Sequence, residues 1–362
     1  MTTQSHPPPL ITAPYTADPS AHVFNGKLYI YPSHDVPTDI ASNDNGDQYA
    51  MNDYHVFSID SLATLTKPSN NQDQKQQAGV TVTDHGTVLS LEQVPWASKQ
   101  LWAPDAAAKN GKYYLFFPAR DEQGLFRIGV AVGTSPEGPF EAQASWIQGS
   151  YSIDPAVFVD SSQYGDGDGD GDGDGDGEAY IYFGGLWGGQ LEKWFPDTSA
   201  AAQGGWKFDA EGKEPSGPGI PALNPRVAKL SPDMLSLASP VQELVITDEN
   251  GAPIQGDDHD RRFFEAAWMH KYNGTYYFSY STGDTHYLVY ATGESPLGPF
   301  RYRGRILEPV LGWTTHHSIA EFEGRWWLFY HDCEISEGKS WLRNVKVREI
   351  GYDDQGRIFL VN

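Results

Sequence analysis

The sequence predicts an all-β fold, a five-bladed β-propeller that forms a single domain from residue 15 to residue 362. A hairpin signature recurs five times along the chain, a short strand carrying a polar residue precedes each copy, and little helical periodicity is found. Repeated units of three or four short antiparallel strands are typical of propellers, in which each unit forms one blade. We expect residues 1–14 to form an N-terminal extension.

Each hairpin copy has a glycine-centred turn followed by a strand rich in aromatic and β-branched residues. The copies begin at residues 25, 110, 177, 273 and 323. Three of the turns read Asn-Gly, a dipeptide that favours a two-residue turn with positive φ at both positions. The spacing of the copies is irregular, which insertions between strands would explain. A β-sandwich is the alternative architecture, but it would not explain a repeated hairpin with a repeated polar residue ahead of it.

The strands on either side of these turns complete the predicted blades. Leading strands are expected at residues 17–24, 103–108, 153–159, 264–268 and 316–322. A third strand is expected at residues 126–132 and 287–292, and a Ser-Pro-x-Gly-Pro-Phe segment follows each of these two strands. This second match between distant segments supports a repeat architecture.

Composition restricts the partners of the chain. It has 25 basic and 48 acidic residues, a formal net charge of −23, and 13% aromatic residues. Such an acidic balance argues against nucleic acid or an anionic membrane as partner, and it suits a neutral ligand. The first 14 residues lack a secretory pattern, no run reaches the ~18 apolar residues of a membrane span, and Cys333 is the only cysteine. We therefore expect a soluble cytoplasmic protein.

Two polar segments are expected to be loops. Residues 165–177 alternate Gly and Asp, but the glutamate that a calcium-binding EF-hand needs at its twelfth position is absent. We interpret this run as an expanded, solvated turn, and the Gln-rich residues 70–77 as an insertion.

Polar residues recur at matching places in the leading strands. They are Asp18, Asp105, Asp154, Glu265 and His316. Because the innermost strands of a propeller surround its axis, we expect these side chains to meet in one pocket.

The carboxyl groups among them have different surroundings. Glu265 lies between aromatic and small apolar residues, which should raise its pKa and keep it protonated. Asp18 and Asp154 each precede a proline, whose fixed φ can hold a carboxylate rigidly. Two carboxyl groups in an aromatic pocket are the minimum for hydrolysis of a glycosidic bond. The plainer alternatives are that each Asp-Pro only caps a strand and that Glu265 pairs with Arg261 or Arg262.

The blade motifs resemble those of glycoside hydrolase family 43, particularly its β-xylosidase and α-L-arabinofuranosidase members. The segments that carry the resemblance are residues 17–20, 101–105, 152–156, 264–266 and 315–318. The resemblance runs from about residue 15 to the carboxyl terminus. It implies an inverting, exo-acting hydrolase with Asp18 as general base and Glu265 as general acid, while Asp154 orients Glu265 and raises its pKa. The implied reaction releases xylose from the non-reducing end of β-1,4-xylo-oligosaccharides, with α-L-arabinofuranosidase side activity.

The resemblance also implies further contacts. Family members often hold calcium near the axis through water and one histidine, a position that His316 matches, and Arg343 matches an arginine that contacts the sugar. Trp102 and Trp187 could stack on a sugar ring, and His34 is a weaker candidate for substrate binding.

Three other functions remain open at this point. The enzyme could be primarily an α-L-arabinofuranosidase acting on oligosaccharides derived from arabinoxylan. A retaining, fructan- or sucrose-cleaving hydrolase is disfavoured, because its nucleophile follows an aromatic residue and Asn, whereas Thr16-Ala17 precedes Asp18. A non-catalytic sugar-binding propeller would need the pocket but not all three acids.

Overall fold

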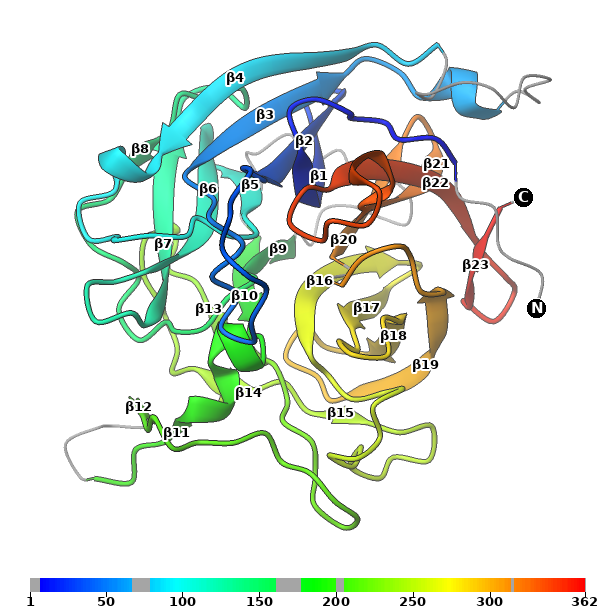
Figure 1. The fold of residues 1–362 in the computed structure, drawn as a ribbon. Helices are drawn as coiled ribbons and strands as arrows, with labels where there is room; N and C mark the ends of the chain where they lie inside the picture. Colours follow the sequence, from blue (N-terminus) through cyan, green and yellow to red (C-terminus); the bar gives the residue numbers. More distant parts are fainter. Residues whose placement is uncertain (1–6, 67–78, 161–176, 200–204, 314–315, 362) are drawn as a thin grey trace.

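Five β-sheets are arranged in a ring, which confirms the predicted five-bladed propeller. The structure, a computed structural model, describes residues 7–66, 79–160, 177–199, 205–313 and 316–361. In Figure 1 the sheets follow one another around the ring, from the first blade at the top through the second on the left to the fifth on the right.

Within the described residues each blade is a four-stranded sheet, except the fourth blade, which has a fifth strand. In sheet order the strands are β1 (Thr16–Phe24), β2 (Lys27–His34), β3 (Asp53–Ile59) and β4 (Val82–Ser90) in the first blade; β5 (Asp105–Lys109), β6 (Lys112–Arg120), β7 (Phe126–Gly133) and β8 (Glu141–Ala142) in the second; β9 (Ala156–Asp160), β10 (Glu178–Phe183), β13 (Arg226–Lys229) and β14 (Gln242–Glu243) in the third; β16 (Glu265–Tyr272), β17 (Thr275–Ser281), β18 (Leu288–Gly293), β19 (Phe300–Leu307) and β15 (Ile246–Thr247) in the fourth; and β20 (His317–Phe322), β21 (Arg325–Asp332), β22 (Asn344–Tyr352) and β23 (Ile358–Leu360) in the fifth. All neighbours in a blade are antiparallel except β15 and β19, which are parallel.

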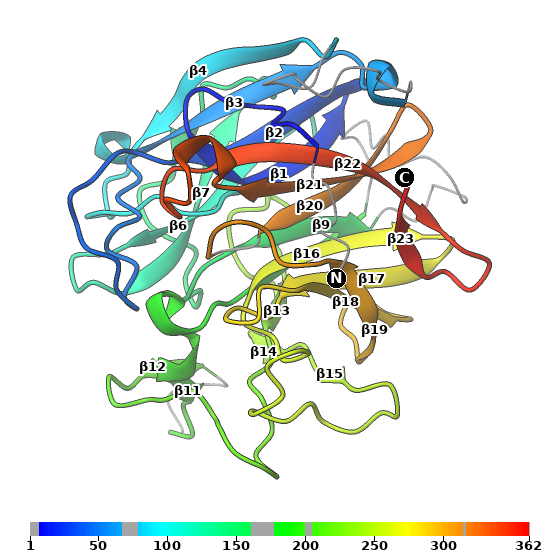
Figure 2. The ribbon, with the colours of Figure 1, turned by 45° about the vertical axis from the view of Figure 1, so that its right-hand side comes forward.

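The remaining elements lie between the blade strands. A separate hairpin is formed by β11 (Trp194–Pro196) and β12 (Trp206–Phe208), and Figure 2 shows it below the ring, near β14 and β15. Five short 3-10 helices occur in the described residues: η1 (Ala63–Thr66), η2 (Leu91–Gln93), η3 (Trp187–Gly189), η4 (Leu191–Lys193) and η5 (Glu334–Ser336). In the described part of the chain, no helix is long and apolar enough to cross a membrane.

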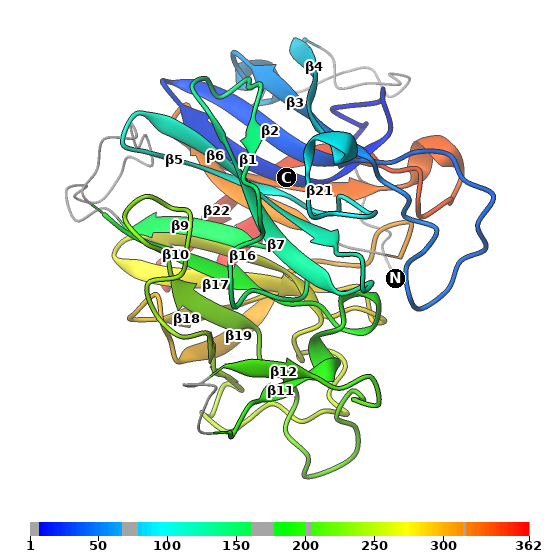
Figure 3. The ribbon, with the colours of Figure 1, turned by 90° about the vertical axis from the view of Figure 1, so that its left-hand side faces the viewer.

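The innermost strands form a closed circle around the axis. β5 contacts β1 and β9, β16 contacts β9 and β20, and β20 contacts β1. Figure 3 shows β5, β9 and β16 side by side. This circle brings the first residues of five strands, which are far apart in sequence, to the same end of the axis.

Four of the five predicted hairpins have the expected turn. Asn25 and Gly26 have φ of 53° and 72°, and the pairs that begin at Asn110, Asn273 and Glu323 repeat this geometry. Positive φ at both central residues defines a turn whose twist matches that of the flanking strands. The remaining hairpin joins β9 to β10 through residues 161–177, which include the Asp-Gly run. Residues 165–176 of that run, like the Gln-rich segment 70–77, lie outside the described residues.

The amino-terminal residues join the first blade to the fifth. Leu10 donates a backbone hydrogen bond to Val345 at 2.7 Å, and Ile11 forms a β-bridge with the same residue. Both side chains are buried in an apolar cluster built from β1, β2 and β3 on one side and β20, β21 and β22 on the other. The end of the predicted N-terminal extension therefore packs into the seam between the two blades.

Asp105 links three blades. Its carboxylate accepts hydrogen bonds from Ser20 Oγ at 2.5 Å, His22 Nε2 at 2.7 Å, the amide of Val157 at 2.5 Å and the amide of Ala106 at 2.8 Å. These bonds join β1, β5 and β9. The expectation that Asp105 shares the pocket of the other carboxyl groups is wrong, because its oxygens point between the strands.

We expect Asp105→Ala to lower the free energy of unfolding by about 2–5 kcal/mol, because it leaves several buried donors without an acceptor. Denaturant titration followed by tryptophan fluorescence measures the change. Asp354→Ala, at an exposed aspartate, is the control and should lie within about 0.5 kcal/mol of the parent. A loss no larger than that of the control would rule out a linking role for Asp105.

Candidate active site

A pocket of about 270 Å³ opens at the end of the axis where the innermost strands begin. We call it the axial pocket. Its lining includes Asp18, Asp154 and Glu265 from three blades, together with His316 and Arg343 from the segments that precede β20 and β22. The structure thus brings the three predicted acids into one pocket with His316, the predicted metal ligand, and Arg343, the predicted sugar contact.

Unusual backbone geometry directs the carboxyl groups into the pocket. Asp18 and Asp154 have φ of 49° and 56°, and Ala266, next to Glu265, has φ of 64°. The pairing of β1 with β2 and of β16 with β17 shifts register at the same places. A residue other than glycine is strained by roughly 1–3 kcal/mol at such positive φ, in the left-handed region of backbone conformation, and such strain is common at functional sites.

Asp18 is held in its ionised form. Arg343 donates to both carboxylate oxygens, from Nη1 to Oδ1 at 3.0 Å and from Nη2 to Oδ2 at 3.2 Å, and Ser33 Oγ donates at 2.6 Å. Burial alone would raise the pKa of Asp18, but Arg343, His331 and His316 outweigh it and, with the serine, lower the pKa to about 2. Asp18 can therefore accept a proton at neutral pH.

Asp35 fixes the other side of the same arginine. Its Oδ2 accepts from Arg343 Nε at 2.9 Å and from the Arg343 amide at 2.8 Å, and its Oδ1 accepts from Nη2 at 2.8 Å. Both residues are buried, so the guanidinium cannot turn towards solvent. Sequence reasoning missed Asp35, because it follows the second strand of its blade, whereas the candidate acids were sought in the leading strands.

Glu265 and Asp154 form a coupled pair. Asp154 Oδ2 accepts a hydrogen bond from the amide of Ala266 at 2.8 Å, which holds it beside Glu265. Burial and then the charge of Asp18 raise the pKa of Glu265 to about 8. Burial, followed by the charges of Glu265 and Asp18, raises the pKa of Asp154 well above its ordinary value. The pair therefore holds a proton at neutral pH, close to an ionised aspartate.

Neither Arg261 nor Arg262 forms an ion pair with Glu265, because both arginines pair with other acids. Arg261 pairs with Asp258 at 2.5 Å and with Glu249 at 2.6 Å. Arg262 instead lies 3.0 Å from Glu214 and 3.1 Å from Asp284. The plainer alternative for Glu265 is thereby removed.

His316 is the one residue of the axial pocket that we predicted as a metal ligand. Its Nδ1 lies 3.8 Å from Asp18 Oδ1 and 3.7 Å from Asp154 Oδ2. Burial lowers its pKa, and a neutral imidazole is the form that can bind a metal. Among the described residues, the triplet of side chains close enough to share an ion lies elsewhere, at His34, Asp53 and His55. The donors at His316 thus fit a cation held mainly through water.

Three tryptophans line the axial pocket. Trp187 stacks against Trp313 with ring centroids 5.7 Å apart, and its edge meets Phe264 at 5.1 Å. Trp187 Nε1 donates to Glu214 at 2.7 Å, which fixes the ring. Trp102 is 9% exposed, so little of its ring is free to meet a ligand. Trp313 was missed, because it lies in a connecting segment without a repeat signal.

His34 lies outside the axial pocket. Its predicted contact with the substrate is therefore not supported by its position. Its Nδ1 is 2.6 Å from Asp53 Oδ1, and neither residue is part of the pocket lining. Alternation along β2 explains the placement, because Ser33 points to Asp18 and the next side chain must point to the opposite face.

The loop between β2 and β3 covers one side of the axial pocket. Residues 42–51 of this loop contribute to the lining, and Gly46 packs so closely on Trp102 that a Cβ there would lie 2.5 Å from the indole ring. Gln100 donates to the Gly46 carbonyl at 2.9 Å, and Arg120 donates to the Asn45 carbonyl at 2.9 Å. The loop is therefore fixed on the second blade. Its polar, turn-rich sequence gave no signal of this role.

The geometry describes a site for acid and base chemistry on a neutral ligand with ring faces. One ionised carboxylate and one protonated carboxyl pair face a cavity with aromatic walls, and a pinned loop limits its extent. Carboxyl groups with pKa values pushed apart are the usual acid and base of glycoside hydrolysis.

Comparison with known proteins agrees with this chemistry. Residues 80–193 and 212–358 match the model of the glycosyl hydrolases family 43. The chain is 65% identical over 354 residues to a xylosidase/arabinosidase of Humicola insolens, an alignment that covers 97% of this chain and 98% of that protein. It is 48% identical to a β-xylosidase of Xylanibacter ruminicola, with 95% and 96% covered.

Solved structures show the same fold. A family 43 β-xylosidase/α-arabinofuranosidase from a compost microbial metagenome, in complex with xylotriose and in a calcium-free form, superposes with a TM-score of 0.83 at 55% identity, covering 98% of this chain and 96% of that one. A family 43 enzyme from Xanthomonas citri in complex with xylotriose gives a TM-score of 0.82 at 47% identity, covering 97% and 92%. The chain belongs to family 43 of the glycosyl hydrolases.

Proposed function

We propose that the protein is an inverting exo-glycosidase that releases xylose from the non-reducing end of β-1,4-xylo-oligosaccharides, with α-L-arabinofuranosidase side activity. The main support is the opposite ionisation of two acids in one pocket, Asp18 with a pKa of about 2 and Glu265 with a pKa of about 8. Relatives whose names combine the two activities support action on both xylose and arabinose units. The second candidate is an enzyme that acts primarily as an α-L-arabinofuranosidase, which those double names also allow.

In this mechanism Asp18 takes a proton from a water molecule, which attacks the anomeric carbon from the face opposite the leaving group. Glu265 gives its proton to the glycosidic oxygen as that bond breaks. Asp154 and Glu265 share one proton, and the bond from the Ala266 amide favours the ionised form of Asp154 and so the proton on Glu265. Arg343 keeps Asp18 ionised and borders the space where the sugar binds. Trp187 and Trp313 supply apolar ring faces for the sugar.

We also propose that calcium binds in the axial pocket, with the His316 imidazole as a side-chain ligand and water in most of the shell. The ion would supply positive charge beside the carboxylates. The support is the neutral imidazole between Asp18 and Asp154, together with the calcium-free form of one solved relative.

The stereochemistry of the product tests the reaction. With xylobiose as substrate, proton NMR should detect α-xylose as the first-formed anomer, because inversion of a β-linkage yields the α-anomer. Initial appearance of the β-anomer would contradict the assignment of Asp18 as base, and no hydrolysis of xylobiose or of nitrophenyl xyloside and arabinofuranoside would overturn the proposed function.

Leaving-group dependence should separate the two acids. Glu265→Ala should lose about 10²–10⁴-fold in activity on xylobiose but much less on an aryl xyloside with an acidic phenol, because a good leaving group departs without a proton. Asp18→Ala should lose similar factors on both substrates, since water attack is always needed. If Glu265→Ala is equally impaired on both, another residue is the acid.

The pH profile should depend on Asp154. Glu265 acts when protonated, so kcat/KM should fall as the pH rises through the pKa of about 8. Asp154→Asn removes a negative charge beside Glu265, lowers the pKa of Glu265 and should therefore move this basic limb to lower pH. Asp354→Asn, at an exposed site, is the control with no shift. An unmoved or higher basic limb in Asp154→Asn would refute the coupling.

Calcium dependence can be measured apart from turnover. After exhaustive dialysis against a chelator, activity should fall, added calcium should restore it, and added calcium should raise the thermal midpoint by binding only the folded state. His316→Gln should lose both effects. Unchanged activity and midpoint, with no calcium found by elemental analysis of the untreated protein, would leave His316 as an ordinary pocket residue.

A further inference from the structure

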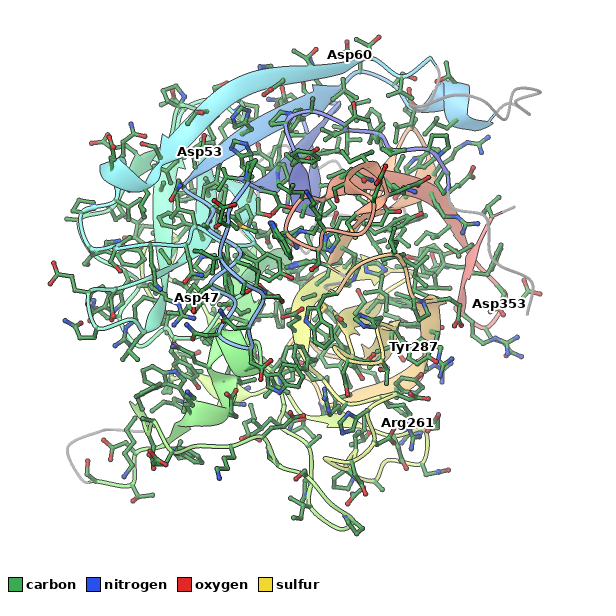
Figure 4. The ribbon with its side chains drawn as sticks, in the orientation of Figure 1. Asp47, Asp53, Asp60, Arg261, Tyr287 and Asp353 are labelled. Carbon is green, nitrogen blue, oxygen red and sulfur yellow. The ribbon has the colours of Figure 1, made fainter. Side chains whose placement is uncertain are left out.

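A second cluster of ionisable side chains lies in the first blade, outside the axial pocket. It consists of His34, Asp53 and His55, whose potential ligand atoms all lie within 4.8 Å of one another. We call it the β2–β3 cluster. Figure 4 labels Asp53 at the start of β3. The hydrolytic chemistry described above uses none of the three residues.

Strand geometry puts these side chains together. His34 ends β2 and Asp53 begins β3, and the register that pairs Ser33 with Tyr54 sets the two opposite each other. His55 follows Asp53 by two residues, so it lies on the same face of the sheet. The two imidazole rings meet edge to face with their centroids 4.9 Å apart.

The hydrogen bonds around His55 match the outer shell of a metal site. Its Nδ1 lies 3.0 Å from Asp84 Oδ1 on β4, and its Nε2 faces Asp53 Oδ2 at 3.7 Å and Thr87 Oγ1 at 3.4 Å. Metal-binding histidines commonly donate one ring nitrogen to a carboxylate, which fixes the tautomer and leaves the other nitrogen for the ion. Here Asp84 is the outer carboxylate, and Nε2 is directed at the cluster.

We propose that the β2–β3 cluster binds a divalent late first-row transition-metal ion such as Zn²⁺ through His34, Asp53 and His55. Two imidazoles and one carboxylate suit zinc, cobalt, nickel or copper, whereas calcium prefers oxygen ligands. The ion would take the place of the proton between His34 Nδ1 and Asp53. The bound imidazole is then neutral and carries its proton on Nε2, so a proton is released to solvent only where His34 was doubly protonated before binding. The side chains of His34, Asp53 and His55 are 19%, 19% and 14% exposed, so an ion can reach them and water can complete its shell.

The position of the cluster gives such an ion a structural effect. Residues 35–52 leave the sheet after His34 and return at Asp53, and this is the loop that covers the axial pocket. A metal held by both ends would close the base of the loop. We therefore infer that occupancy stiffens the loop rather than taking part in the reaction.

The test uses the full-length chain without a polyhistidine tag, stripped with a chelator and titrated with Zn²⁺ by calorimetry and with Co²⁺ by visible absorption. We expect one ion per chain and an absorption spectrum of nitrogen- and oxygen-bound Co²⁺. His34→Gln and His55→Gln should each weaken binding at least tenfold, and Asp84→Asn about 10–100-fold, as removal of an outer partner does.

Two controls separate this site from others. His259→Gln removes a histidine that also pairs with an aspartate, Asp284, at 2.7 Å, and should leave zinc binding unchanged. His316→Gln removes the proposed calcium ligand and should also leave it unchanged. Hydrolysis of an aryl xyloside by each variant before chelator treatment, with calcium present and no zinc added, reports that each variant outside the axial pocket is folded.

Hydrogen exchange of residues 36–52 provides the second measurement. Zn²⁺ should slow exchange there in the parent chain but not in His55→Gln. The proposal is overturned if the parent binds no stoichiometric ion, or if His34→Gln, His55→Gln and Asp84→Asn all bind as the parent does. The cluster would then be only a network of histidine–aspartate pairs.

Discussion

The guanidinium of Arg343 joins the closure of the ring to the chemistry of the site. It lies just before β22 in the last blade and binds Asp18 on β1 and Asp35 just after β2, both at the open end of the first hairpin. Its backbone takes part as well, because the Arg343 carbonyl accepts from the Thr16 amide at 3.1 Å. Removing one partner of such a buried pair typically costs about 3–5 kcal/mol. The contact that fixes the last blade against the first is therefore also the one that ionises the base.

The axial pocket shifts the pKa values of similar carboxyl groups in opposite directions. Asp18, Asp154 and Glu265 are all withdrawn from bulk water, and burial pushes the pKa of each upward. What separates them is what surrounds each carboxyl group. Arg343 is bonded to Asp18 and, together with His331, His316 and the hydrogen bond from Ser33, lowers the pKa of Asp18. Burial and the charge of Asp18 raise the pKa of Glu265, and the pKa of Asp154 is raised by burial and by both neighbouring acids. The placement of the cationic groups therefore makes a base and an acid from the same kind of side chain.

The fold was predictable because its signals are local and repeated. An Asn-Gly turn requires positive φ, and the structure has it at Asn25, Asn110 and Asn273. Repetition also found the acids of the pocket, since equivalent strands begin at equivalent places. It failed at Asp105, because an equivalent position in the strand does not determine where a side chain points. Asp35 and Trp313 were not found in this way, since each lies in a connection rather than in a leading strand and meets its partner only in three dimensions.

The loop between β2 and β3 explains how a symmetric ring produces an asymmetric site. Five similar blades alone would leave an open channel, and a long chain could pass along it. In this chain the first blade extends residues 42–51 over the pocket, and contacts from the second blade hold them there. Because the loop rests on Trp102 and on Arg120, its position depends on the packing of two blades rather than on its own sequence. A pocket closed on one side favours the end of a sugar chain over its middle, so the exo specificity that we propose would arise from blade packing as well as from the residues that touch the sugar.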